Sequence, residues 1–159
     1  MDRITPVAIA LGSNVGDRRA HLDYAVSNLR SLLTSVRVSH YNDTVPVGVS
    51  GPQALFLNGA LVGETTMSAQ ALLQALLAIE QERGRERPYA NAPRTLDLDL
   101  ILFGDVVLDE PDLIVPHRRF RERRFVLEPL AEIAPSLRDP GSGSTVDELL
   151  ARFNNPTGR

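Results

Sequence analysis

Two hydrophobic periods alternate along the first hundred residues of the chain. Residues 6–12 form a short apolar run that predicts a buried strand, and apolar residues at helical spacing follow over residues 22–33. Residues 36–41 alternate as in a strand, and residues 56–66 are strand-like again. A second helical period covers residues 69–79. The first part of the chain is therefore expected to run strand, helix, strand, strand, helix.

Capping and turn residues agree with this order. Asp17 closes a turn that begins at Gly12 and is a good N-cap for the first helix, as Ser68 is for the second. Gly84 is placed to end the second helix. A loop with glycines and prolines separates the two central strands, and an arginine-bearing loop over residues 85–95 follows the second helix.

The next strand, residues 96–103, carries an unusual pair of charges. Leucines at 96, 98, 100 and 102 are expected on one face. Asp97, Asp99, Ile101 and Phe103 are then expected on the other face, so the two carboxylates point the same way, roughly 6–7 Å apart along the backbone. The full order β-α-β-β-α-β predicts an α+β, ferredoxin-like fold in a single domain, residues 1–159.

The remaining residues, 104–159, are expected to add short strands, a helix near residues 129–134 and a terminal helix near residues 146–153. The chain has 159 residues, of which 43% are hydrophobic, and is therefore long enough and apolar enough to bury a core. It has no cysteine, no pattern of a signal peptide and no apolar run of the ~20 residues that would span a membrane. We therefore expect a cytoplasmic protein without a membrane partner.

The charge balance excludes some functions. The net charge of -3 argues against general nucleic-acid binding. All 17 basic residues are arginines, which excludes lysine chemistry such as Schiff bases or a P-loop lysine. The arginines cluster in two stretches, residues 83–94 and 118–124.

The acid pair suggests a chemistry. Two like charges so close repel each other unless a cation lies nearby, and hard divalent cations take oxygen ligands. Arg94 precedes Asp97 and Asp99, and arginine suits bidentate contacts to phosphate. These residues indicate magnesium–nucleotide chemistry. The alternative is a solvent-facing strand end with two solvated acids.

Four blocks of the sequence carry a resemblance to a known family. They are Ala10–Asn14, Phe56–Asn58, Arg94–Asp99, and Val115–His117 with Arg123 and Phe125 beyond it. In this order and spacing the chain resembles the 6-hydroxymethyl-7,8-dihydropterin pyrophosphokinases over residues 7–137, with a C-terminal extension over residues 138–159. The resemblance implies transfer of diphosphate from ATP to the hydroxymethyl group of the pterin, releasing AMP, in folate biosynthesis. It also implies two Mg²⁺ ions held by Asp97 and Asp99.

The resemblance implies an ATP site that includes four of the nine clustered arginines. The residues that match ATP contacts are Glu80, Arg85, Arg87, Arg94, His117 and Arg123. Arg85 and Arg94 are expected to be catalytic together with the two acids. For Glu80 the alternative is an ordinary exposed acid on a helix. The other arginines of 118–124 are expected to be solvated.

The pterin ring needs aromatic faces and a group that reads its hydrogen-bonding edge. By resemblance the ring contacts Gly12, Thr44, Val47, Phe56, Asn58 and Phe125. Phe56 and Phe125 match the stacking positions, and Asn58 matches the residue that reads the edge. Phe56 stands where many members of the family have tyrosine.

Two other functions fit the same fold. RNA-recognition domains share this topology, but they stack bases on sheet aromatics, and this chain has 5% aromatic residues and an acidic balance. A regulatory domain that binds nucleotide without catalysis would keep the same residues. We expect an enzyme that acts as a monomer on ATP and the pterin, without nucleic acid.

Overall fold

Strands and helices follow one another along the chain in the predicted order, with one short additional strand, Asn42–Thr44. The computed structural model describes residues 3–45, 55–84 and 95–154. The strands are β1 (Thr5–Ser13), β2 (Thr34–Val38), β3 (Asn42–Thr44), β4 (Phe56–Thr65) and β5 (Asp97–Phe103). All neighbours are antiparallel in the order β2-β4-β1-β5, with β3 paired to the end of β4. With α1 (Arg18–Leu32) and α2 (Ala69–Glu82) between strands, this is the predicted α+β, split-βαβ arrangement.

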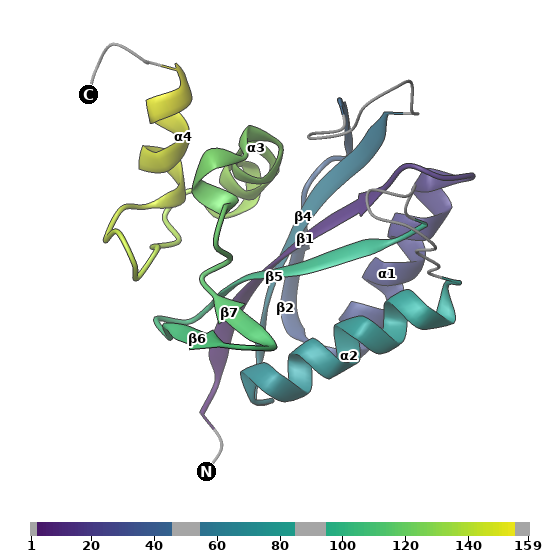
Figure 1. Ribbon diagram of the computed structural model, residues 1–159, viewed down its shortest axis with the longest axis horizontal. Coiled ribbons are helices and arrows are strands. Elements are labelled where there is room, and N and C mark those ends of the chain that lie inside the picture. Colours follow the sequence, from purple (N-terminus) through teal and green to yellow (C-terminus); the bar gives the residue numbers. More distant parts are fainter. Residues whose placement is uncertain (1–2, 46–54, 85–94, 155–159) are drawn as a thin grey trace.

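One face of the sheet packs against α1 and α2 (Figure 1). The predicted caps are present: the Asp17 carboxylate accepts from Ala20 N at 3.1 Å, and the Ser68 hydroxyl accepts from Ala71 N at 3.1 Å. Alternate residues of β1 and leucines of both helices form the core between the two layers. This core occupies one side of every central strand and leaves the other side for different contacts.

The opposite face carries the two C-terminal helices, whereas the hairpin before them packs against the core under α1 and α2 (Figure 1). The hairpin β6 (Leu108–Glu110) and β7 (Leu113–Val115) leads through the 3₁₀ turn η1 (Phe120–Glu122) to α3 (Arg124–Ile133), and α4 (Val146–Asn154) packs beside α3. A second apolar cluster joins these helices to the sheet. Within the described ranges, no helix has the length and apolar character that crossing a membrane would require.

Strand β5 departs from simple alternation. Its register with β1 shifts by one residue, because Leu100 pairs with Ile9 but Leu102 pairs with Ala8. Ile101 is the extra residue of a β-bulge. As a result Leu102 lies in the cluster under α3, and Phe103 lies in the core under α1 and α2. The prediction for these two positions was wrong, while the faces predicted for residues 96–101 are correct.

Two element boundaries also differ from the predictions. The strand predicted over residues 36–41 ends at Val38, where Ser39 turns inward: its hydroxyl accepts from Ala60 N at 2.9 Å. Helix α3 begins at Arg124 rather than near Pro129, so that Pro129 lies inside it. The helix predicted near residues 146–153 is present as α4.

Candidate active site

The residues expected in the site form rows across the sheet. Gly12 pairs with Asp97 on one side and with Asn58 on the other, and Asn58 pairs with Asn42 of β3. Because directly opposed residues of antiparallel strands share a face, Asp97 and Asn58 lie on the same side of the sheet. The next row places Asp99 beside Ala10. Strand pairing therefore joins segments that are far apart in the sequence.

This face of the sheet is divided into an apolar half and a polar half. The apolar half includes Ala8, Val62 and Leu102 and is covered by α3. The polar half carries both acids, each half-buried, and the amide of Asn58. A sheet face with polar side chains at one end and a covered core at the other is typical of a binding surface built on a rigid scaffold.

The Asn58 side chain is oriented by its neighbours. The Thr44 hydroxyl donates to Asn58 Oδ1, and Asn58 Nδ2 lies 3.5 Å from Leu11 O. Residue 12 must be small here, since a Cβ on Gly12 would lie 3.1 Å from Asn58 Nδ2 and 3.6 Å from the Phe56 ring. The oxygen end of the amide thus faces Thr44, and its nitrogen end lies toward β1.

Two half-buried aromatic side chains stand at the borders of the polar half. Phe56 begins β4 and pairs with Thr44. Phe125, in the first turn of α3, packs against the second apolar cluster, and the guanidinium of Arg123 lies 5.7 Å from the centre of its ring. Both rings are therefore carried by regular elements, Phe56 by β4 and Phe125 by α3.

His117 lies where the chain returns to the edge of β5. Its backbone N–H donates to Ile101 O at 2.9 Å, and its Nδ1 accepts from Arg119 N at 3.3 Å. Burial is the largest cause of a lowered pKa at His117, Arg123 lowers this pKa further, and Asp97 acts to raise it. The three side chains are thus close enough to interact, and a neutral ring that accepts at Nδ1 carries its proton on Nε2.

Glu80 lies in the last turn of α2 and is 2% exposed, so it is not the exposed helix acid of the alternative interpretation. Its carboxylate accepts from Leu98 N at 2.7 Å. This contact fastens α2 to the edge strand between the two aspartates. A contact between Glu80 and ATP stays a prediction.

Arg121 forms an interaction that the sequence did not predict. It was expected to be solvated, but it forms a two-point ion pair with Asp139, at 2.5 and 2.8 Å, and Asp139 is fully buried. The carboxylate also accepts from Gly141 N and from the Ser142 hydroxyl. Burial acts to raise the pKa of Asp139, but these hydrogen bonds, Arg121 first, hold it at about 2.

Four predicted residues lie outside the described residues: Val47, Arg85, Arg87 and Arg94. Within the described ranges no three His, Asp or Glu side chains gather to hold a metal ion by themselves. Two carboxylates still suit Mg²⁺, which usually takes one or two carboxylates and completes its shell with water and phosphate oxygens. The donor set of Asp97 and Asp99 therefore fits the expected cation.

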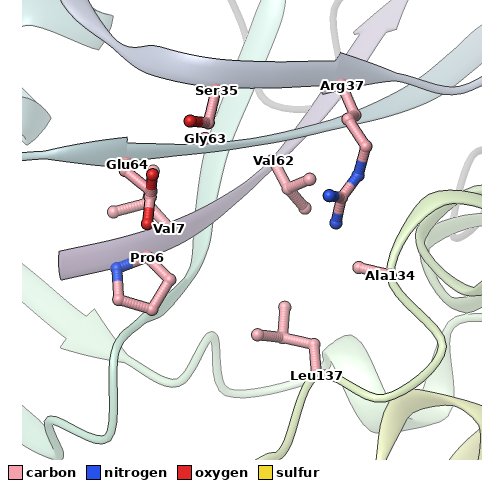
Figure 2. Close-up of a pocket in the computed structure, with 9 residues that line it drawn as sticks. All are labelled: Pro6, Val7, Ser35, Arg37, Val62, Gly63, Glu64, Ala134 and Leu137. Carbon is pink, nitrogen blue, oxygen red and sulfur yellow. The ribbon is translucent and has the colours of Figure 1, made fainter.

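A pocket of about 340 Å³ lies elsewhere on the same sheet, at the end where β1 begins. Figure 2 shows Arg37 and Glu64 on opposite sides of the pocket, with Pro6 beside Glu64 and with Val62 and Leu137 between the two sides. Arg37 Nε donates to Ile133 O at 3.1 Å, so this cation is engaged with the end of α3. The pocket shares none of the predicted site residues.

One face of the sheet thus carries acids, an amide, two aromatic rings and an arginine–histidine pair. This combination is typical of a protein that binds a phosphorylated ligand, a cation and a flat ring. The comparisons with known proteins are more specific. Residues 8–135 match the family model of the 7,8-dihydro-6-hydroxymethylpterin-pyrophosphokinases. The chain belongs to this family, and is therefore an enzyme of the diphosphotransferase class that serves folate biosynthesis.

Individual relatives agree. The chain is 43% identical over 150 residues to a 2-amino-4-hydroxy-6-hydroxymethyldihydropteridine pyrophosphokinase of Pseudomonas aeruginosa, covering 93% of this chain and 91% of that protein. It is 41% identical over 147 residues to the Synechocystis enzyme of the same name, covering 92% and 75%.

A solved structure with a similar fold is a Plasmodium falciparum HPPK-DHPS chain with pteroate, at a TM-score of 0.75 and 14% identity. The alignment covers 96% of this chain but 43% of the Plasmodium chain, so this protein spans less than half of that chain. At this level of identity the likeness supports the fold.

Proposed function

We propose that this protein transfers the terminal diphosphate of ATP to the hydroxymethyl group of 6-hydroxymethyl-7,8-dihydropterin in a Mg²⁺-dependent reaction. The pterin hydroxyl oxygen forms a bond to the β-phosphorus, the bond from this phosphorus to the oxygen of the α-phosphate breaks, and AMP leaves. The hydroxyl proton is released. The observation that carries the proposal is the row in which Asp97, Gly12 and Asn58 face the same way.

Asp97 and Asp99 would hold the cations, for which we propose two Mg²⁺ ions. When bound, Mg²⁺ neutralises the phosphate charge and polarises the phosphoryl oxygens. The chain's own contribution is to keep both carboxylates on one face. The regular pairing of β5 with β1 from Asp97 to Leu100 does this.

The pterin would lie over Gly12, between the rings of Phe56 and Phe125. Asn58 would read its edge with one donor and one acceptor, with Thr44 fixing which end of the amide is which. Val47 completes the proposed pocket. A glycine beneath a flat ligand allows the ring to approach the strand backbone closely.

The triphosphate would lie on the side of β5 and α3. We propose contacts from Arg123 and from Nε2 of His117, together with Arg85, Arg87 and Arg94, of which Arg85 and Arg94 are catalytic. Glu80 is proposed to contact the nucleotide as well. Diphosphate transfer depends mainly on positioning and charge neutralisation, which is the role given to these groups.

The wider setting is part of the proposal. The protein acts as a monomer in the cytoplasm, as a single pyrophosphokinase domain over residues 1–159 with residues 138–159 as an extension. The cysteine-free sequence is compatible with a reducing compartment.

The test of the proposed function is AMP formation from ATP and the pterin. We expect AMP and the diphosphorylated pterin in equal amounts with Mg²⁺, and none when the cation is removed by EDTA. Tight ATP binding without AMP would instead identify a regulatory nucleotide-binding domain. Product formed in EDTA would remove the proposed role of the cation.

Replacing Asn58 with alanine should affect the two substrates differently. Removal of one partner of a buried polar group costs about 1–3 kcal/mol, so the pterin Kd should rise about 5- to 150-fold. The ATP Kd should change less than about twofold. Calorimetry of each ligand measures this, with Asn28→Ala as the control, since the Asn28 side chain donates to Tyr24 O within α1. Equal losses for both ligands would contradict the assigned pocket.

A further inference from the structure

Arg18 joins three elements that are distant in the sequence. It is the first residue of α1, and its backbone is fixed there by the turn that follows β1, where Arg18 N donates to Gly16 O at 3.0 Å. Its side chain reaches across to β3 and to the residue before β4. Arg18 Nη1 donates to Asp43 Oδ1 at 2.6 Å and to Leu55 O at 2.8 Å.

These two partners border residues of the proposed pterin site. Asp43 precedes Thr44, and Leu55 precedes Phe56, while Thr44 and Phe56 are themselves paired between β3 and β4. Strand β3 has three residues and pairs with β4 at the end of the sheet. Such a short strand has few hydrogen bonds of its own, so contacts from outside the sheet decide how well it is held.

We propose that Arg18 is a positioning residue for pterin recognition. By holding Asp43 and Leu55 together, it keeps β3 in register with β4 and the Thr44 hydroxyl against Asn58 Oδ1. The amide of Asn58 then presents a defined donor and acceptor to the ring. Arg18 therefore acts through β3 and Thr44 without touching the substrate, and this inference rests on the proposed function.

The effect of Arg18 on pterin affinity can be measured separately from its effect on the stability of the whole protein. The side chains of Arg18 and Asp43 are 29% and 52% exposed, and ion pairs at such sites contribute little to global stability. Loss of the pair should loosen β3 locally while the two apolar cores stay intact. Pterin affinity should suffer, and ATP affinity should not, because Arg123 and His117 lie on other elements.

The experiment compares Arg18→Met, Arg18→Lys and Asp43→Asn with the wild type, and uses Arg30→Met at the other end of α1 as the control. Calorimetry measures the Kd of the pterin and of ATP, and amide hydrogen exchange measures the protection of Asn42–Thr44 without ligand. For Arg18→Met we expect a pterin Kd about tenfold higher, an ATP Kd within about twofold and exchange of β3 about tenfold faster. Arg18→Lys should recover most of both effects, and Asp43→Asn should lose part of them.

The outcomes separate this inference from the proposed function. If Arg18→Met binds the pterin as the wild type does, or loses both ligands equally, the positioning role is wrong. If the wild type forms no AMP from ATP and the pterin, the proposed function fails, and exchange of β3 still decides whether Arg18 holds this strand. Unchanged exchange in Arg18→Met would overturn the inference whatever the ligand.

Discussion

Replacing Asp97 or Asp99 with alanine should lower the rate of AMP formation by on the order of 10³-fold or more. A bound cation supplies several kcal/mol of charge stabilisation, and each 1.36 kcal/mol corresponds to about tenfold in rate. Each variant removes one of the two carboxylates of β5, of which Asp97 lies opposite Gly12 and Asp99 opposite Ala10 of β1. Steady-state kinetics at saturating ATP and pterin, with Mg²⁺ varied, measures the loss.

The matched control is Asp105→Ala, an exposed acid in the turn after β5. This variant should turn over as the wild type does. Thermal unfolding should show that Asp97→Ala and Asp99→Ala are folded, because neither side chain belongs to an apolar cluster. Normal turnover of either variant at saturating Mg²⁺ would mean that the acids do not hold the cations.

Replacing Arg121 with methionine should lower the free energy of unfolding by about 3 kcal/mol. The variant leaves the buried Asp139 carboxylate without its cation, and breaking a buried pair in this way typically costs about 3–5 kcal/mol. The lower end applies because Arg121 itself is 32% exposed. Urea unfolding at pH 7 measures the change, and Arg118→Met is the control, since its contact with Asp109 is long, at 3.8 Å, and both side chains are mostly exposed.

The same ion pair predicts a dependence on pH. The folded pKa of Asp139 is about 2, below the ordinary value of 3.8. The unfolded chain therefore binds a proton more readily than the folded chain, and the stabilisation is complete above about pH 4 and is lost as the pH falls toward 2. Stability that is equal in Arg121→Met and in the wild type at pH 7 would contradict this account of the pair.

The sequence predicted the features that depend on local chemistry. The caps at Asp17 and Ser68 follow from the hydrogen bonds that helix ends need, and both are present. The shared face of Asp97 and Asp99 follows from the two-residue period of a strand. The order of strands and helices along the chain, apart from the short β3, follows from the alternation of strand and helix periods in the hydrophobic pattern.

Features that depend on distant partners could not be predicted in the same way. Arg121 lies in η1 and Asp139 lies beyond the end of α3, so the two residues are separated by 18 positions and meet only in the folded chain. The Thr44–Asn58 contact requires the pairing of β3 with β4, which no local pattern of residues 42–44 indicates. Helix α3 includes Pro129, although proline favours the first turn of a helix, because the apolar face of α3 is buried against the sheet.

The bulge at Ile101 has a consequence for how this protein can vary. An extra residue already accommodated in β5 marks the point where the strand can change length: without it, Leu100 and Leu102 would still face Ile9 and Ala8 in an unbroken ladder. A length change between Asp97 and Leu100 has no such freedom, because it would rotate one acid into the leucine layer. Insertions and deletions in homologous strands should therefore accumulate after the two acids. When this strand is grafted into another sheet, its pairing register must be set by the residues from Asp97 to Leu100, before the bulge.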